Sequence, residues 1–310
     1  MIDFTDEVVI VTGAGRGLGR LYALELADRG AAVVVNDVGG SMGGDGTDRG
    51  VADGVVQEIV ARGGRAIASH ESVASADGGA AIVNAALDAF GRLDTVVSNA
   101  GIFHTAEFVD LTPDIWERMV GVHLHGAFYL SQPAYRVMKA QGHGRFVFVS
   151  SSAGLFGQPN SAHYAAAKAG VMGLSNVIAI EGAAHGISAN CVLPFGYSRM
   201  VTETVGDREQ FAGELPFLDA IDPELVVPIV VFLASRACEV THHCFSACAG
   251  RFSRVFVGQG RGWVATTGSN PSADDIAEHW TAVSATDPFS IPGSIFDEVA
   301  ETCSIIGIPL

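Results

Sequence analysis

Val8-Val9-Ile10-Val11-Thr12-Gly13-Ala14-Gly15-Arg16-Gly17-Leu18-Gly19 is the stretch that decides the fold. Its first four residues are β-branched and apolar, which is typical of a strand buried on both faces of a parallel sheet. The glycines then allow a tight turn, and a helix through Leu21, Leu24 and Leu26 is expected next. A glycine turn between a strand and a helix lets backbone N–H groups approach a pyrophosphate. The stretch therefore predicts an α/β unit that binds a dinucleotide.

The same strand-and-helix pattern repeats further along the chain. Further strands are predicted at 32–35, 66–68, 95–97, 146–149 and 188–192, and helices end near Gly30 and Ala61 or span 78–90. This alternation predicts a Rossmann-type doubly wound parallel sheet covered on both faces. We expect one main domain over 1–257, because no linker rich in Pro and Ser interrupts it. A polar stretch at 258–272 and a helix-like segment at 273–284 predict a C-terminal extension, 258–310, packed on that domain.

Composition limits the classes of partner and the compartment. The chain has 310 residues, of which 48% are hydrophobic and 17% are charged, with a net charge of −16. The charge argues against nucleic acid as a partner. No apolar run reaches the roughly 18 residues of a membrane span, and the acidic N-terminus is unlike a signal peptide. The C-terminal tripeptide Ile308-Pro309-Leu310 is not a peroxisomal address, so we expect a cytoplasmic protein.

The cysteines of the chain raise two possibilities, disulfides and a metal site. Five cysteines, an odd number, suggest a reducing compartment without a disulfide framework. His242, His243, Cys244 and Cys248 offer ligand atoms for zinc, but their spacing matches no strong zinc template. Cys244-Phe245-Ser246-Ala247-Cys248 is better interpreted as a buried strand, so no metal site is predicted.

The end of the second strand indicates which dinucleotide is bound. Asp37 lies 24 residues after Gly13 (37 − 13). A carboxylate there accepts hydrogen bonds from the adenosine ribose and repels a 2′-phosphate, which favours NAD over NADP. Arg16 in the turn favours NADP, because a guanidinium binds a 2′-phosphate. We expect NAD, since contact between two anions costs more than one flexible Arg recovers. Ser72 and Val73, after the third strand, border the adenine or form an ordinary loop.

Tyr164-Ala165-Ala166-Ala167-Lys168 carries the chemistry. In a helix, a spacing of four places Tyr164 and Lys168 on one face, one turn apart. A phenol ionises near pH ~10, and a neighbouring ammonium lowers its pKa so that it exchanges protons with an alcohol or ketone near neutral pH. Taken alone the pair is a weak signal, because an ordinary helix face produces the same spacing.

The motifs taken together resemble one family. They are Thr12-Gly13-x3-Gly17-x-Gly19, Asn99-Ala100-Gly101, Ser151, Tyr164-x3-Lys168 and Asn190-Cys191-Val192-Leu193-Pro194. In this order they resemble the short-chain dehydrogenase/reductase family, over about residues 5–200. The resemblance implies that Tyr164 is the general acid/base and that Ser151 hydrogen-bonds the substrate oxygen. It also implies that Lys168 lowers the Tyr164 pKa and binds the nicotinamide ribose.

The resemblance further implies a set of cofactor-binding residues. Asn99 would support the strand beside the cofactor, and the backbone after Pro194 would hold the carboxamide. The full set is Thr12, Gly13, Arg16, Gly17, Leu18, Gly19, Asp37, Ser72, Val73, Asn99, Ala100, Gly101, Tyr164, Lys168, Pro194, Gly196 and Ser198. The family usually has an Asn, supporting a proton-relay water, where this chain has His123. We expect His123 to relay protons, with the alternative that it only bonds a backbone carbonyl in its helix.

A closer resemblance suggests a substrate. Val35-Asn36-Asp37-Val38-Gly39-Gly40, Val122-His123-Leu124, Ile180-Glu181-Gly182 and Ser198-Arg199-Met200 look like the (3R)-hydroxyacyl-CoA dehydrogenase unit of peroxisomal multifunctional enzyme type 2 and its bacterial stand-alone relatives. This implies NAD-dependent oxidation of a 3-hydroxyacyl-CoA with a fatty or steroid side chain. Three arginines in the C-terminal part have two possible roles. They bind CoA phosphates, or they are ordinary surface residues: Arg251, Arg254 and Arg261.

Other expectations and alternatives follow from the same resemblance. The family's substrate lid lies in the segment from Met200 to Pro223, where Phe211, Leu215, Phe217 and Leu218 either cover a hydrophobic substrate or pack internally. A homodimer or homotetramer is expected, through the helices after the fourth and fifth strands. An NADP-dependent 3-oxoacyl reductase and a steroid or other alcohol dehydrogenase are alternative enzymes. A nucleotide-sensing binding protein without catalysis is the non-enzyme alternative.

Overall fold

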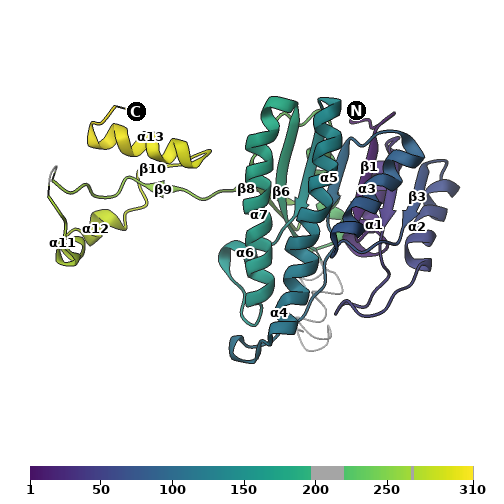
Figure 1. The fold of residues 1–310 in the computed structure, drawn as a ribbon, viewed down its shortest axis with the longest axis horizontal. Helices are drawn as coiled ribbons and strands as arrows, with labels where there is room; N and C mark the ends of the chain where they lie inside the picture. Colours follow the sequence, from purple (N-terminus) through teal and green to yellow (C-terminus); the bar gives the residue numbers. More distant parts are fainter. Residues whose placement is uncertain (197–219, 267–268, 310) are drawn as a thin grey trace. The chain divides into compact units, whose positions relative to one another are not determined.

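The computed structural model describes residues 1–196, 220–266 and 269–309. The chain forms two compact units, Met1–Arg254 and Val255–Leu310, and each is described by itself. The first unit contains the sheet and all the strands predicted from the sequence (Figure 1).

The first unit is built on an eight-stranded sheet. Its strands are β1 (Val8–Thr12), β2 (Ala32–Asn36), β3 (Arg65–Ser69), β4 (Thr95–Ser98), β5 (Gly144–Val149), β6 (Ile187–Phe195), β7 (His243–Cys248) and β8 (Arg251–Val255). The spatial order is β3-β2-β1-β4-β5-β6-β7-β8, and the pairs from β3 to β7 are parallel. The predicted Rossmann-type sheet is confirmed.

Helices cover both faces of this sheet. Their bounds are α1 (Gly17–Asp28), α2 (Gly50–Ala61), α3 (Ala76–Phe90), α4 (Pro113–Val120), α5 (Gly126–Gln141), α6 (Ala153–Phe156), α7 (Ala162–Gly182) and α10 (Val227–Ala234). Helix α1 packs with α2 and α10, whereas α5 packs with α3 and α7. Short helical turns lie at Phe108–Asp110 (η1), Gly121–His125 (η2), Ala183–His185 (η3) and Pro223–Val226 (η5).

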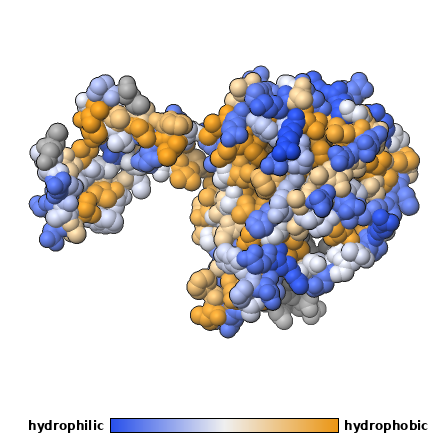
Figure 2. All heavy atoms as spheres, in the orientation of Figure 1, coloured by the Kyte–Doolittle hydropathy of each residue, from blue (hydrophilic) through white to orange (hydrophobic). Residues whose placement is uncertain are grey.

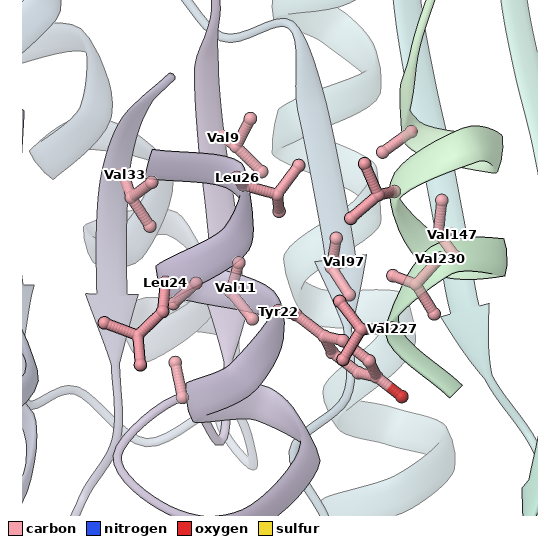
Figure 3. Packing of buried hydrophobic residues seen from close by; sticks show 14 of the residues in the cluster. Val9, Val11, Tyr22, Leu24, Leu26, Val33, Val97, Val147, Val227 and Val230 are labelled. Carbon is pink, nitrogen blue, oxygen red and sulfur yellow. The ribbon is translucent and has the colours of Figure 1, made fainter. Parts of the chain in front are cut away.

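The alternation of side chains along the strands produces the core. Val9 and Val11 on β1 pack with Tyr22 of α1 and Val230 of α10 in one buried cluster (Figure 3). The intervening Ile10 is fully buried but lies outside this cluster. Successive side chains of a strand point to opposite faces, so one β-branched run supplies both faces of the sheet. This explains why β1 is buried at every position.

The far edge of the sheet is a hairpin. Strands β7 and β8 are joined by Ala249 and Gly250, both with positive φ (50° and 74°), which is the type I′ pattern of a two-residue hairpin. The predicted strand from Cys244 to Cys248 is confirmed as part of β7, although only Ala247 of these is fully buried. Among the described residues, no group of three or more His, Cys, Asp or Glu is placed to hold a metal ion.

The second unit contains short elements. Strands β9 (Gln259–Gly260) and β10 (Phe289–Ser290) pair antiparallel, and the helices are α11 (Ala273–Glu278), α12 (Trp280–Val283) and α13 (Ile295–Ile306). The helix-like segment at 273–284 is therefore two helices, and the first begins with a capping box of Ser272 and Asp275. No described residue of this unit is buried, and apolar side chains are exposed along α13 (Figure 2).

No described helix has both the length and the apolar composition that crossing a bilayer requires.

Candidate active site

A cavity of about 570 Å³ lies within the first unit, where the carboxyl ends of β1, β2, β4 and β5 meet. Seventeen of the sequence-predicted residues line it: Gly13, Arg16, Gly17, Leu18, Gly19, Asp37, Ser72, Val73, Asn99, Ala100, Gly101, His123, Ser151, Tyr164, Lys168, Pro194 and Gly196. Thr12 is buried beside them, and Ser198 lies outside the described residues. The structure thus brings the predicted cofactor and catalytic residues to one place, as expected for an open parallel sheet.

The glycine turn is fixed by close backbone contacts. Gly13 has φ of +62°, and a Cβ added there would lie 2.8 Å from the Cα of Ala100. A Cβ on Gly19 would lie 2.1 Å from the carbonyl oxygen of Gly13. Both positions therefore require glycine, so that β1, the turn and the loop after β4 pack with no side chain between them.

Thr12 and Asn99 join the turn to β4. The Thr12 hydroxyl oxygen accepts hydrogen bonds from the backbone N–H groups of Asn99 and Ala100, both at 3.0 Å. The Asn99 side-chain amide donates to the carbonyl oxygens of Thr12 (2.9 Å) and Gly13 (3.2 Å). These two side chains therefore hold the cavity wall in shape.

Asp37 is held by the backbone at the end of β2. Its Oδ2 accepts a hydrogen bond from Gly15 N–H at 2.9 Å, and its Oδ1 accepts one from Gly39 N–H at 2.7 Å. A carboxylate offers about four acceptor positions, so Asp37 retains capacity for ligand hydroxyls. Arg16 directs Nη1 to the carbonyl oxygen of Gly40 at 3.4 Å, and thus towards the loop after β2.

Helix α7 presents Tyr164 and Lys168 to the cavity from one face, as the spacing predicted. The Lys168 ammonium donates to the carbonyl oxygen of Val149 at 2.7 Å and lies 5.7 Å from the centre of the Tyr164 ring. The Ser150 hydroxyl donates to the carbonyl oxygen of Lys168 at 2.8 Å, which ties α7 to the end of β5. Ser151 forms a side-chain hydrogen bond with Tyr164.

Burial controls the protonation of both groups. It raises the pKa of Tyr164, and the hydrogen bond with Ser151 opposes this only in part. It also lowers the pKa of Lys168 to about 8, because a buried ammonium loses its hydration. The expectation of a lowered Tyr164 pKa is therefore wrong for the polypeptide itself, since desolvation of the phenolate is the larger effect.

His123 lies in the π-helical turn η2, between α4 and α5. Its Nε2 is 2.7 Å from the carbonyl oxygen of Ile102, and its ring meets the Tyr164 ring edge-on, with centres 5.2 Å apart. Burial, and then the charge of Lys168, hold the His123 pKa well below its usual range. The Ile102 N–H also lies 3.2 Å from Nε2, where it would donate to the other tautomer; a neutral ring that instead donates from Nε2 to the closer carbonyl keeps Nδ1 as an acceptor. Nδ1 is buried without a hydrogen-bond partner in the described part of the chain.

The outcome for His123 differs from the alternative considered in the sequence. The carbonyl that it bonds belongs to Ile102, in the loop after β4, and not to its own helix. The ring also lies against Gly101, where an added Cβ would be 2.5 Å from His123 Cε1. His123 therefore connects the loop after β4 to Tyr164.

Sequence reasoning missed a second group of cavity residues. They come mainly from the loops after β2 and β4: Gly40, Ser41, Met42, Gly44, Ile102, Phe103, Gln158 and Phe195. Phe103 meets the Tyr164 ring edge-on, with centres 5.6 Å apart. The glycine-rich composition of 39–50 was a visible signal of an unusual loop, but nothing local indicated that this loop lines the cavity.

Two other predicted features lie elsewhere. Of the lid segment, residues 200–219, with Phe211, Leu215, Phe217 and Leu218, lie outside the described residues. Arg251 and Arg254 are exposed on β8, and Arg261 is exposed in the second unit. Arg251 and Arg254 do not line the cavity.

Comparison with known proteins adds to this geometry. The family model described as short chain dehydrogenase matches residues 7–210. A short-chain type dehydrogenase/reductase of Mycobacterium tuberculosis is 39% identical over 278 residues, which cover 90% of this chain and 94% of that protein. Peroxisomal multifunctional enzyme type 2 of Mus musculus is 42% identical over 252 residues, 81% of this chain but 33% of that enzyme, so this chain matches about a third of its length.

A solved structure gives the same relationship. Full-length peroxisomal multifunctional enzyme type 2 of Drosophila melanogaster superposes with a TM-score of 0.81 at 29% identity, covering 99% of this chain and 50% of that one. The similarity therefore includes residues beyond the part matched by the family model.

Proposed function

Because this chain belongs to the short-chain dehydrogenase family, whose members are oxidoreductases acting on CH–OH groups, we propose that it oxidises a secondary alcohol to a ketone with NAD. The observation that carries the proposal is the meeting of Ser151, Tyr164 and Lys168 in the cavity that also contains the glycine turn and Asp37. A proton-transfer group and a dinucleotide-binding turn in one cavity are what hydride transfer from an alcohol requires.

The residues present fit a nicotinamide dinucleotide. Gly13, Gly17 and Gly19 would hold the pyrophosphate at the start of α1, and Asp37 would accept from the adenosine ribose. The bound dinucleotide supplies the acceptor of the carbinol hydride. Lys168 lies close enough to Tyr164 to hydrogen-bond a nicotinamide ribose beside it, and the backbone around Gly196 would hold the carboxamide.

The protein's own groups would handle the proton. Ser151 would donate a hydrogen bond to the substrate oxygen and keep it next to Tyr164. Tyr164, as phenolate, would accept the hydroxyl proton as the ketone forms. Burial raises the pKa of this phenol, so the positive charge of Lys168 is needed to make the phenolate accessible. His123, with an acceptor nitrogen at Nδ1, would pass the proton onward through a water.

The choice of NAD rests on Asp37. Its carboxylate lines the cavity and is fixed by two backbone N–H groups, so it cannot turn away from a 2′-phosphate without breaking both bonds. The alternative, an NADP-dependent 3-oxoacyl reductase, is favoured by Arg16, which also lines the cavity. Titration of the purified protein with each dinucleotide decides between them: tighter binding of NADP would reject the proposal. Arg16→Gln should leave the preference for NAD in place, whereas Asp37→Ser should weaken it.

We propose a 3-hydroxyacyl-CoA as the alcohol. This is supported by the similarity to peroxisomal multifunctional enzyme type 2, which includes nearly all of this chain in the solved Drosophila structure. A steroid or another alcohol is the alternative. Purified protein with NAD should produce NADH absorbance with hydroxyacyl-CoA thioesters. Reaction with free steroids or sugars but with no thioester would contradict the substrate assignment.

A nucleotide-sensing protein without catalysis is the non-enzyme alternative. A single-turnover experiment with enzyme in excess over the alcohol distinguishes the two, because a sensor binds NAD but forms no NADH. We also propose that the protein is cytoplasmic and forms a homodimer or homotetramer. Exposed apolar residues on the predicted contact helices support association: Phe128 on α5, and Val177 and Ile180 on α7. Light scattering of the purified protein measures the assembly.

A further inference from the structure

The loop after β2 forms a closed structure along one wall of the cavity. We call residues 39–49 the strap. At its base, Asp48 N–H donates to the carbonyl oxygen of Val38 at 3.0 Å. Gly39 has φ of +75°, and a Cβ there would lie 2.0 Å from the carbonyl oxygen of Asp48. The two ends of the strap are therefore held together, as in an Ω-loop.

The middle of the strap is bonded to the other half of the cavity. Phe103 N–H, in the loop after β4, donates to the carbonyl oxygen of Met42 at 2.9 Å. Gly44 lies against Ile102, so that an added Cβ would be 3.1 Å from the Ile102 Cγ2. The strap therefore extends from the end of β2, where Asp37 lies, to the loop beside Tyr164.

The tip of the strap is bonded to α4 by one side chain. Arg118 Nη1 donates to the carbonyl oxygen of Gly43 at 3.3 Å and to Asp45 Oδ1 at 2.9 Å. Asp45 is itself placed by Ser41, because Ser41 N–H donates to the Asp45 carbonyl oxygen and Asp45 N–H donates to the Ser41 hydroxyl. Arg118 thus bonds both a backbone carbonyl and the carboxylate of one small turn.

The strap contributes directly to the cavity wall. Gly40, Ser41, Met42 and Gly44 line the same cavity as Tyr164, and the Gly40 carbonyl oxygen accepts from Arg16 of the glycine turn. A dinucleotide that extends from Asp37 to Tyr164 would therefore lie against these four residues of the strap. Movement of the strap away from α4 and the loop after β4 would open this wall.

We propose that Arg118 is a positioning residue for the dinucleotide: it holds the strap closed through Gly43 and Asp45, and the strap has to lift before the dinucleotide leaves. This inference rests on the proposed function of the cavity. The side chains of Arg118 and Asp45 are 55% and 71% exposed, so their ion pair is weak and can open often. A contact that opens often can hold the dinucleotide in place and still let it leave fast enough that its release does not limit turnover.

The test compares Arg118→Gln, Asp45→Asn and the double variant with the wild-type protein. Arg62→Gln is the matched control, because Arg62 also forms exposed ion pairs, with Asp28 and Glu58, away from the cavity. Amide hydrogen exchange of residues 39–49 is measured on the protein without nucleotide. The dissociation rate of NADH is measured by stopped-flow fluorescence, and the KM for NAD and kcat are measured separately.

Each single variant should exchange faster in the strap and release NADH about 2- to 5-fold faster, with a higher KM for NAD and no loss of kcat. The double variant should resemble Arg118→Gln, because the Asp45 change adds nothing once the Arg118 guanidinium is gone. Arg118→Lys should keep part of the contact, so its strap exchange and NADH release should lie between those of the wild type and Arg118→Gln. Arg62→Gln should resemble the wild type. Unchanged strap exchange, or additive effects in the double variant, would overturn the inference. If the wild type binds no NADH, the proposed function fails instead, and strap exchange still tests the contact made by Arg118.

Discussion

Tyr164 is the residue on which the proposed chemistry depends most directly. Its hydroxyl has Ser151 as a hydrogen-bond partner, and its ring is enclosed by Phe103 and His123. Tyr164→Phe keeps these ring contacts and removes only the group that exchanges the proton. We expect turnover to fall by about 10²-fold or more while NAD affinity stays the same.

The measurement pairs steady-state NADH formation with NAD titration of the same preparation. Tyr135→Phe is the matched control, because it removes a hydroxyl from α5 that does not line the cavity. Retained turnover in Tyr164→Phe, with the control unchanged, would mean that another group transfers the proton.

Lys168 makes stability depend on pH. Its pKa is lowered from 10.5 to about 8, so between these values the unfolded chain binds more protons than the folded one. The free energy of unfolding therefore rises with pH over this window, because the cost of burying the ammonium disappears as it loses its proton. The rise should be up to about 3 kcal/mol, at about 1.4 kcal/mol per pKa unit.

Urea unfolding at pH 7.5 to 10.5 measures this slope. Lys168→Met should remove this contribution to the slope, since the side chain no longer titrates. Lys139→Met, at an exposed position on α5, should keep it. Equal slopes in Lys168→Met and the wild type would show that the ammonium is not desolvated as its surroundings indicate.

At the scale of elements, the π-helical turn η2 and the loop after β4 act together. The His123 ring occupies the space that a side chain at position 101 would need, with Cε1 2.5 Å from the added Cβ. Gly101→Ala should therefore destabilise the protein by about 1–3 kcal/mol, which is typical of overpacking. In a His123→Ala background the same change should cost much less.

A double-mutant cycle in thermal or urea unfolding measures this coupling. Gly173→Ala is a suitable control, because it adds a methyl group to α7 that meets no other described part of the chain within 4 Å. Equal costs of Gly101→Ala in both backgrounds would show that the steric conflict is with the backbone and not with His123.

The strands were predictable from the sequence, whereas the second wall of the cavity was not. Runs such as Val8–Val11 and Phe146–Val149 are buried on both faces, so their composition alone indicates strands. The π-helical turn leaves no such local signal, because a helical sequence tolerates one wider turn. Contacts such as Arg118 to Gly43 join residues 75 apart, which no local pattern can indicate.

The pKa of Tyr164 was mispredicted for a related reason. The spacing of Tyr164 and Lys168 predicts that they are neighbours on one helix face, but it does not predict how deeply the site is buried. Burial comes from the cavity walls, to which residues 103 and 123 contribute, and it outweighs the opposing hydrogen bond with Ser151. The motifs therefore predicted which residues form the site, whereas the direction of the Tyr164 pKa shift depends on the assembled fold.

At the scale of the whole molecule, the second unit cannot stabilise itself. None of its described residues is buried, and large apolar side chains such as Ile295, Phe296 and Trp280 are exposed. A segment of this length without a core lacks the hydrophobic free energy to offset its chain entropy. Residues 255–310 produced alone should therefore show little helix by circular dichroism and no cooperative melting.

The matching piece, residues 1–254, contains the described core and should melt cooperatively. Stable helical structure in the isolated 255–310 segment would contradict this expectation. The sequence-based expectation that the extension packs on the first domain stays a prediction.

The central position of β1 has a consequence during protein synthesis. Its two neighbours in the sheet are β2, which follows soon in the chain, and β4, which ends at Ser98. At a translation rate of 5–20 residues per second, roughly 4 to 17 s separate Thr12 from Ser98. During that interval one edge of β1 is unpaired, and it is open to other strands or to chaperones. The strand that begins the nucleotide-binding turn thus waits longer for its second neighbour than β2, β4, β5 or β6 wait for theirs.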